Sequence, residues 1–448
     1  MEENTLVTGR IGPALFKFAI PFLVANILQA LYGAVDMFVV GRYADSAALS
    51  AVSVGSQVMQ TFTVLLMGLT TGGTVLIGQR VGARDGKGAA NAVGVMVVLF
   101  SAVAVLLTAG MFFTSAPFVH LLQTPEEAVP HAISYVSICV LGIPFITGYN
   151  TVASIFRGLG DSKRPMICIA AACMINIAGD FLLIGALRMG AAGAAIATVA
   201  AQACSFVVAL ALLVRQGLPF PFSRSDIRFH GPEAGRILKV GLPLCLQDVL
   251  VNMSFLIITA IINGMGLVAS AAVGVVGRVT SFAFLPTGAF SSGVATMAAQ
   301  NIGAGKPDRA LKSLWTAIGF SLVFSTLFCA YSQFWPETLV RIFTSDSAVI
   351  AAGAQYLRAD AYDAVLTAFV FCFNSYFSAC GNSMVSMIHS LIATFLVRVP
   401  VSWLVSRMAV PSLFGIGLAA PAASLFSIVV CFGYFTYLRR KAGDSPLA

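Results

Sequence analysis

The sequence predicts an all-α membrane protein with 12 transmembrane helices in two six-helix bundles, related by a pseudo-twofold axis around a central cavity. Three observations predict this fold, namely an apolar composition, a series of long apolar runs and an internal repeat. The chain of 448 residues is 58% hydrophobic and only 10% charged, with a mean hydropathy of +0.91. Because soluble chains carry about 25% charged residues, this chain lacks the side chains for a soluble surface, and we expect a lipid bilayer around it.

The long apolar runs recur between short polar connectors. A helix needs about 20 apolar residues to cross the hydrocarbon core, whereas the strands of a membrane barrel are about 10 residues long and alternate in polarity. The runs here are longer than such strands and do not alternate, which favours helices. The twelve predicted spans are Leu15–Val40, Leu49–Ile77, Asn91–Phe113, His131–Ile155, Pro165–Ile184, Ala191–Val214, Val240–Asn263, Ala272–Ala298, Leu314–Phe334, Ile350–Phe377, Met384–Ser406 and Gly415–Leu438.

The distribution of Lys and Arg predicts the orientation of the spans, because cytoplasmic loops carry an excess of positive charge. With the N-terminus inside, nineteen of the 26 Lys and Arg residues fall in inner segments, four in outer segments and three within spans. We therefore expect both termini in the cytoplasm. Glu2, Glu3 and Arg10 precede the first span without a small-residue cleavage site, so no signal peptide is predicted.

An internal repeat relates the two halves of the chain. Sliding the sequence by about 221 residues aligns three pairs of segments, each at the same place relative to its span. These pairs are Ile20-Pro21 with Leu242-Pro243, Gln79-Arg80-Val81-Gly82-Ala83 with Gln300-Asn301-Ile302-Gly303-Ala304, and the segment Phe156–Ser162 with Phe377–Ser383.

The repeat predicts the domain organisation. The longest connector carries several prolines and charges, so we predict an N-terminal bundle over residues 1–214, a cytoplasmic linker over 215–236 and a C-terminal bundle over 237–448. Each half has an even number of spans, and both halves therefore enter the membrane in the same orientation. A pseudo-twofold axis along the membrane normal follows, with a cavity where the halves meet, which is the plan of a transporter.

Several other classes of function lack support in the sequence. The net charge of +8 is spread over short connectors, whereas a nucleic-acid binder needs a basic stripe or patch. The nine cysteines show neither a CxxC pair nor a Cys/His ligand spacing, so we expect neither zinc nor a disulfide framework. No GxxxxGK[ST] or HExxH motif occurs. We therefore expect no nucleic-acid partner, no cofactor and no enzymatic activity.

Acidic and polar side chains in the first half point to a cation site, because an ionisable group within a membrane span is costly and functional by default. Asp36 lies in the first span with no Lys or Arg close in sequence, Asn176 and Asp180 are four residues apart in the fifth, and Thr198 lies in the sixth. Residues four apart share one helix face. Their hard oxygen atoms would cage Na⁺ or share a proton. The alternative is a structural polar cluster that holds the helices together.

The second half carries different ionisable groups. Asp360 and Asp363 lie in the tenth span, with Asp363 expected deeper and Asp360 either solvated or paired with Arg358. Asp248 lies near the start of the seventh span, where an interfacial acid is the simpler interpretation. Arg398 lies in the eleventh span. We expect it either to serve as a counter-charge for an acid such as Asp363 or to hold this half in one conformation. The two halves are therefore not chemically equivalent.

The chain resembles the multidrug and toxic compound extrusion (MATE) family along nearly its whole length. No single segment is specific, but their order, spacing and duplication together are. The segments that carry the resemblance are Ile20-Pro21, Leu31–Asp36 with Val40-Gly41-Arg42, Gln79-x-x-Gly82-Ala83, Phe156–Ser162, Asn176-x-x-x-Asp180, Gly190-x-x-Gly193–Thr198, Leu242-Pro243-x-x-Leu246-Gln247 and Gln300-Asn301-x-Gly303-Ala304.

The resemblance implies a secondary active efflux antiporter that exports lipophilic, mostly cationic compounds in exchange for H⁺ or Na⁺ by rocker-switch alternating access. It implies a monomer in the cytoplasmic (inner) membrane of a bacterium. Aromatic and Met side chains facing a cavity would suit flat organic cations. Asp363 is similar to the acid that many members have in the tenth span. The residues similar to the family's cation site, which would hold Na⁺ where that ion is used, are Asp36, Asn176, Asp180 and Thr198.

The acidic residues of the chain depart from the family at one place, and its basic residues bear on one alternative function. Some members carry a Glu in the seventh span, where this chain reads Val249-Leu250-Val251-Asn252, and this shifts the expected coupling to the first half. A lipid-linked oligosaccharide flippase of the same superfamily is the alternative. It would line its cavity with several Arg or Lys for a diphosphate, whereas the basic residues expected mid-membrane are chiefly Arg278 and Arg398.

Overall fold

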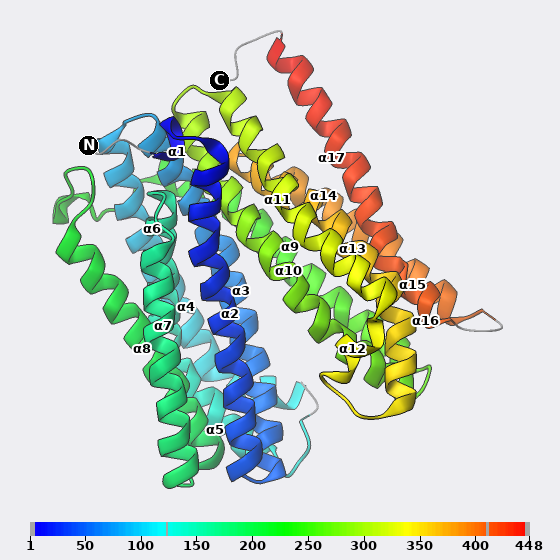
Figure 1. The fold of residues 1–448 in the computed structure, drawn as a ribbon. Helices are drawn as coiled ribbons and strands as arrows, with labels where there is room; N and C mark the ends of the chain where they lie inside the picture. The colour runs from blue at the N-terminus through cyan, green and yellow to red at the C-terminus, as the bar shows by residue number, and fades with distance from the viewer. Residues whose placement is uncertain (1–4, 122–123, 409–411, 444–448) are drawn as a thin grey trace. The chain divides into compact units, whose positions relative to one another are not determined.

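The computed structural model describes residues 5–121, 124–408 and 412–443, and over these residues the chain is almost entirely helical, with no strand (Figure 1). The elements of the first half and the connector are α1 (Thr5–Thr8), α2 (Ile11–Tyr43), α3 (Ser46–Gly82), α4 (Gly86–Leu121), α5 (Val129–Val140), α6 (Ile143–Gly158), α7 (Lys163–Asp180), η1 (Phe181–Ala186), α8 (Gly190–Gln216) and η2 (Arg224–Asp226). Those of the second half are α9 (Gly231–Asn263), α10 (Leu267–Gly303), α11 (Pro307–Phe334), α12 (Pro336–Arg341), α13 (Ser347–Ala379), α14 (Ser383–Ile392), η3 (Ala393–Arg398), α15 (Val399–Ser406), α16 (Leu413–Gly417) and α17 (Ala419–Gly443).

Membrane-spanning helices account for most of the described chain. Ten helices are long and apolar enough to cross a bilayer, and the pair α5 and α6, bent by 46°, makes an eleventh if it is one span. The predicted span Ile350–Phe377 falls within α13, whose 33 residues are long enough to cross. This helix is not among the ten, and it carries Arg358, Asp360, Asp363 and Asn374.

The helices form two compact units. Among the described residues, one unit consists of residues 20–245, and the other consists of residues 5–19 together with those from 246 to 443. The division therefore falls inside α2, next to Pro21, and inside α9, close to Pro243. A proline within a helix removes one backbone hydrogen bond and favours a kink, which makes both positions natural points of division. The first stretch of α9 thus packs with the unit that contains α3 to α8.

Close packing of α3 against α9 holds that first stretch in its unit. A Cβ atom added to Gly72 would meet the carbonyl oxygen of Ile237, and one added to Gly241 would meet that of Leu69, both well inside van der Waals contact. Glycine is therefore required where these backbones approach. Beside this contact, Ile237 belongs to an apolar core that includes Met96 and Ile155.

In the second unit, the N-terminal segment packs on α10 and α11. The ring of Phe16 lies 6.3 Å from that of Phe290 and 5.9 Å from that of Phe320, measured between centroids. The amide of Asn301 donates to the carbonyl oxygen of Leu6 at 3.0 Å, and the guanidinium of Arg309 donates to that of Gly9. Aromatic packing and polar contacts to backbone therefore both anchor this segment.

Each half has a π-helical segment in its fifth span, although η3 begins closer to the start of its span than η1 does. The first, η1, begins directly after Asp180, and the second, η3, ends at Arg398. Both follow an α-helix that opens the fifth span of its half, α7 and α14. π-Helical turns are rare and are often found at functional sites. The backbone therefore repeats a specialised feature beside residues that the sequence had singled out.

Candidate functional site

Asp36 is buried in α2, with its side chain facing neighbouring helices of the first unit. It is 6% exposed, and its Oδ1 atom has no hydrogen-bond partner among the described residues. A buried polar atom without a partner costs free energy and requires an explanation, such as a bound ion, a proton or water. Tyr32 lies one turn earlier in α2 and interacts electrostatically with Asp36.

Asn176 and Asp180 lie one turn apart on α7, as their spacing predicts. They are 1% and 0% exposed, and both polar atoms of each side chain lack a hydrogen-bond partner among the described residues. Asp180 and Asp36 also interact electrostatically, so α7 and α2 bring the two carboxyl groups into one cluster. The first-unit cluster thus contains five buried polar atoms without partners, from Asp36, Asn176 and Asp180.

Thr198, the fourth predicted residue, is half-buried in α8 and joins the cluster through a tyrosine. The hydroxyl of Tyr135 interacts with that of Thr198 and lies 3.2 Å from Ser56 Oγ. Tyr135 also interacts electrostatically with Asp36. Tyr135 and Tyr32 were missed by sequence reasoning. The four-residue spacing from Asp36 could have indicated Tyr32, but no local signal relates Tyr135 to a residue about a hundred positions away.

The chemistry of this cluster suits a cation or a proton. Within the described residues no group of three or more His, Cys, Asp or Glu side chains gathers as a metal site, so a bound ion here would need neutral oxygens beside the two carboxylates. Asn176 and Thr198 supply such oxygens, and hard oxygen ligands suit Na⁺ as they suit other hard cations. Alternatively, the two acids would share protons through the hydroxyl groups.

A cavity of about 70 Å³ lies beside the cluster within the first unit. Its walls include Asn176 and Thr198, whereas Asp36 and Asp180 are not among its lining residues. A cavity needs roughly 10–15 Å³ of this kind of volume to hold its first water, and this cavity exceeds that minimum several-fold. Arg157 also lines it and is only 8% exposed. Arg157 lies in the last turn of α6, and the packing of this helix buries its side chain.

The second-unit candidates form a separate arrangement. The hydroxyl of Ser424 donates to Asp363 Oδ1 at 2.5 Å, and Asp360 is 8% exposed. Arg398 interacts electrostatically with both acids, but among the described residues it makes no ion pair with either. Its guanidinium carbon instead lies 4.2 Å from the centroid of the Phe255 ring. Arg358 is exposed, and Asp360 is neither solvated nor paired with it.

The two remaining residues named from sequence belong to the second unit. Asp248 is half-buried in α9, and its backbone carbonyl accepts a hydrogen bond from Asn252 at 2.8 Å. Arg278 is exposed on α10. Neither is among the residues that line the cavity of the first unit. Of the residues predicted from sequence, the structure therefore brings together Asp36, Asn176, Asp180 and Thr198.

Known proteins are similar to this chain over nearly its whole length. The MatE family model matches residues 21–182 and again residues 243–404, so the predicted internal repeat is confirmed. "Probable multidrug resistance protein YpnP" of Bacillus subtilis is 31% identical and covers 99% of this chain and 98% of its own length. "Probable multidrug resistance protein NorM" of Thermotoga maritima is 26% identical, over 89% of this chain and 86% of its own.

Solved structures of similar fold agree with these matches. A crystal structure of MATE in the bent conformation superposes with a TM-score of 0.91 at 21% identity, covering 99% of this chain and 98% of the other. An outward-facing multidrug resistance MATE family transporter gives a TM-score of 0.89 at 22% identity, with the same coverage. A likeness at this identity shows the fold, and the predicted all-α membrane fold of two helical bundles is confirmed. The central cavity between the bundles stays a prediction.

Proposed function

The chain belongs to the MatE family of transporters, and from this premise we propose that it is a secondary active multidrug efflux antiporter. It exports lipophilic, mostly cationic compounds in exchange for H⁺ or Na⁺. The relatives named as multidrug resistance proteins support multidrug efflux. The observation that carries cation coupling is the group of buried, unpartnered polar atoms of Asp36, Asn176 and Asp180 within one helical unit.

In the proposed mechanism the coupling cation acts on the first-unit cluster. With the site open to the outside, H⁺ or Na⁺ binds at Asp36 and Asp180 and neutralises their charge. This rearranges α2 and weakens the binding of a cationic compound, which leaves outward by rocker-switch alternating access. The coupling cation is later released inward. A ligand drives such a change only through its different affinities for the two states, so the charge of the two acids is the proposed basis of coupling.

The proposed setting is the cytoplasmic membrane of a bacterium, with both termini in the cytoplasm and the protein acting as a monomer. The asymmetry of Lys and Arg supports this orientation. In this orientation the stretch around residue 157 and the connector between α8 and α9 face the cytoplasm.

The test is efflux of a cationic dye from proteoliposomes, first under an imposed Na⁺ gradient and then under an imposed pH gradient. We expect one of the two gradients to drive efflux and Asp36→Asn to abolish that driven component. Glu337→Gln serves as the matched control, because it also neutralises one acid but at a side chain that is 55% exposed in α12. Undiminished gradient-driven efflux by Asp36→Asn would show the proposal to be wrong.

A further inference from the structure

Arg157 is a buried cation without a counter-charge. It lies in the last turn of α6, is 8% exposed and lines the cavity of the first unit. Among the described residues its guanidinium makes no hydrogen bond or ion pair, although it interacts electrostatically with the phenol of Tyr149. A buried charge is costly unless it is paired and hydrogen-bonded. The folded protein therefore leaves the positive charge of Arg157 without a protein partner.

The nearby polar groups are already engaged elsewhere. Asp161 is the acid closest in sequence, and its Oδ2 pairs with Arg164 Nε at 3.0 Å. Its Oδ1 accepts from the backbone amides of Lys163 and Arg164 at 2.9 and 3.2 Å. The phenol of Tyr149 donates to the carbonyl oxygen of Pro165 at 3.3 Å. Among the described residues no acid pairs with Arg157, so an anionic ligand in the cavity would supply the missing counter-charge.

The cavity around Arg157 offers neutral hydrogen-bonding groups and apolar surface. Asn26, Asn150 and Gln202 supply amides, and Phe22 supplies an aromatic face. Along α7 the lining extends from Pro165 to Asn176, eleven residues or roughly 16 Å at 1.5 Å per residue. The Arg157 end is thus well separated from the acidic cluster behind Asn176. Amides that donate and a flat apolar wall suit an organic anion rather than a second cation.

We propose that Arg157 forms an anion-binding subsite of the first unit, which takes the carboxylate or phosphate of a small organic anion. The planar guanidinium binds either group through two parallel hydrogen bonds. The amide of Gln202 completes the shell, whereas that of Asn150 already donates to the carbonyl oxygen of Ile146 at 2.9 Å, and the apolar wall takes the organic part. This extends the ligands of the protein beyond the cationic compounds of the proposed function, and it includes compounds that carry both charges.

The experiment measures thermal unfolding of the purified protein in a neutral detergent at constant ionic strength. The probes are benzoate and phenyl phosphate, and benzamide is the neutral isostere of benzoate. A ligand that binds only the folded protein raises the Tm in proportion to the logarithm of its concentration once the site is saturated. We expect both anions to raise the Tm above its value in benzamide, and Arg157→Gln to remove that difference. Arg164→Gln, which neutralises the neighbouring paired arginine, should keep it.

Equal Tm shifts for benzoate and benzamide in the wild type, or an unchanged anion effect in Arg157→Gln, would overturn the proposal. Arg157→Lys keeps the charge but loses the two-pronged geometry, and it should show a smaller anion effect. Because Arg157→Gln could fail to fold, hydrogen exchange of the wild type provides a second measurement. Benzoate should slow exchange at residues 158–163 and not at 379–383, the corresponding loop of the other unit. Binding is measured without a gradient, so its failure leaves the antiport proposal intact.

Discussion

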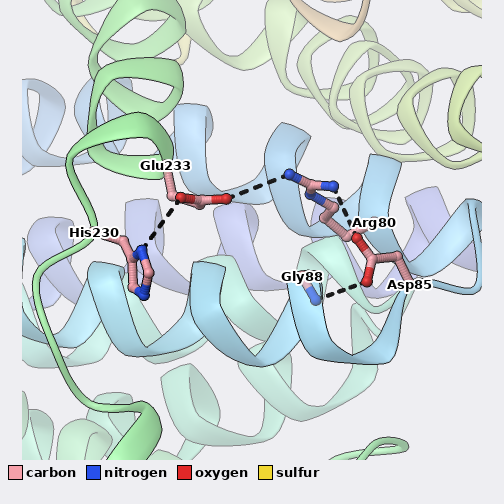
Figure 2. Close-up of polar contacts among 5 residues, drawn as sticks. All are labelled: Arg80, Asp85, Gly88, His230 and Glu233. Atoms are coloured by element: carbon pink, nitrogen blue, oxygen red, sulfur yellow. Dashed lines mark hydrogen bonds and ion pairs between the residues drawn. The ribbon is translucent and has the colours of Figure 1, made fainter.

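Arg80 at the end of α3 reaches Glu233 at the start of α9, with Nη2 3.4 Å from Oε1 (Figure 2). Arg80 Nη1 also pairs with Asp85 Oδ2 at 2.8 Å, and Asp85 Oδ1 accepts from the amide of Gly88. On the other side, His230 Nδ1 lies 4.0 Å from Glu233. This network connects the first turn of α9 and the connector before it to the unit that contains α3. The glycine contacts between α3 and α9 support the same packing.

Removing one partner of this pair is expected to destabilise the first unit. The side chains of Arg80 and Glu233 are 25% and 14% exposed, so the pair is screened less than a surface pair. We expect Glu233→Gln to lower the free energy of unfolding by about 1 kcal/mol. Denaturant unfolding in detergent would measure it, in a double-mutant cycle with Arg80→Gln.

The control is Glu337→Gln, whose partner Arg341 lies 3.3 Å away in an exposed pair on α12. This pair is 63% and 55% exposed, so its removal should change stability by less than about 0.5 kcal/mol. A cycle in which Arg80 and Glu233 show no more coupling than Arg341 and Glu337 would contradict the prediction.

The close approach of α3 and α9 predicts a strong effect of a single methyl group. In Gly72→Ala the new Cβ atom would overlap the backbone oxygen of Ile237, and backbone cannot yield as a flexible side chain does. Overpacking costs about 1–3 kcal/mol and occasionally more, so we expect a clear fall in Tm. Gly110→Ala is the matched control in α4, where nothing lies within 4 Å of the added atom. It should stabilise by about 0.5–1 kcal/mol.

The connector between the two halves should loosen in acid. Hydrogen bonds from the backbone amide and hydroxyl of Ser223, at 2.8 and 2.9 Å, hold the pKa of Asp226 below its usual value. Because the folded pKa is the lower one, this contact contributes fully above about pH 4 and is lost as the pH falls through the depressed pKa.

Hydrogen exchange of residues 223–228, corrected for intrinsic rates, would measure this change between pH 6 and pH 3. Asp226→Asn should show the weaker protection already at pH 6 and little further change in acid. Equal protection of the wild-type connector at both pH values would contradict the assignment.

Coupling is expected to depend on the first unit more than on the second. Asp180→Asn removes one of the two interacting carboxyl groups, so gradient-driven dye efflux should fall about tenfold or more, within the usual range of coupling energies. Asp363→Asn should keep most of the driven efflux, because the hydrogen bond from Ser424 already engages that acid. A larger loss in Asp363→Asn than in Asp180→Asn would place the coupling in the other unit.

Sodium binding offers an independent measurement at the same residues. If Na⁺ is the coupling ion, it should raise the Tm of the wild type above its value in the same concentration of choline. Asp36→Asn and Asp180→Asn should each abolish this difference, because each removes a carboxylate that would contact the ion. An unchanged sodium effect in both variants would show that the ion binds elsewhere.

The membrane class, the helical spans and the repeat were predictable from sequence, because each rests on local composition and spacing. Asn176 and Asp180 share a helix face through their spacing alone, and Asp36 is conspicuous as an acid in an apolar run. The family model, matching twice at the predicted interval, confirms the repeat. These properties need no knowledge of which helices touch.

Contacts between distant parts of the chain were decided only by the tertiary structure. Tyr135 interacts with Thr198, Arg398 lies over the ring of Phe255 rather than in an ion pair with Asp363, and Arg157 is buried beside the cavity of the first unit. Helical spacing determines the face on which a residue lies, but not the neighbour that covers that face. The neighbour depends on how whole helices pack, as where α9 lies against α3. This packing places the unpaired Arg157 and the acidic cluster within one unit.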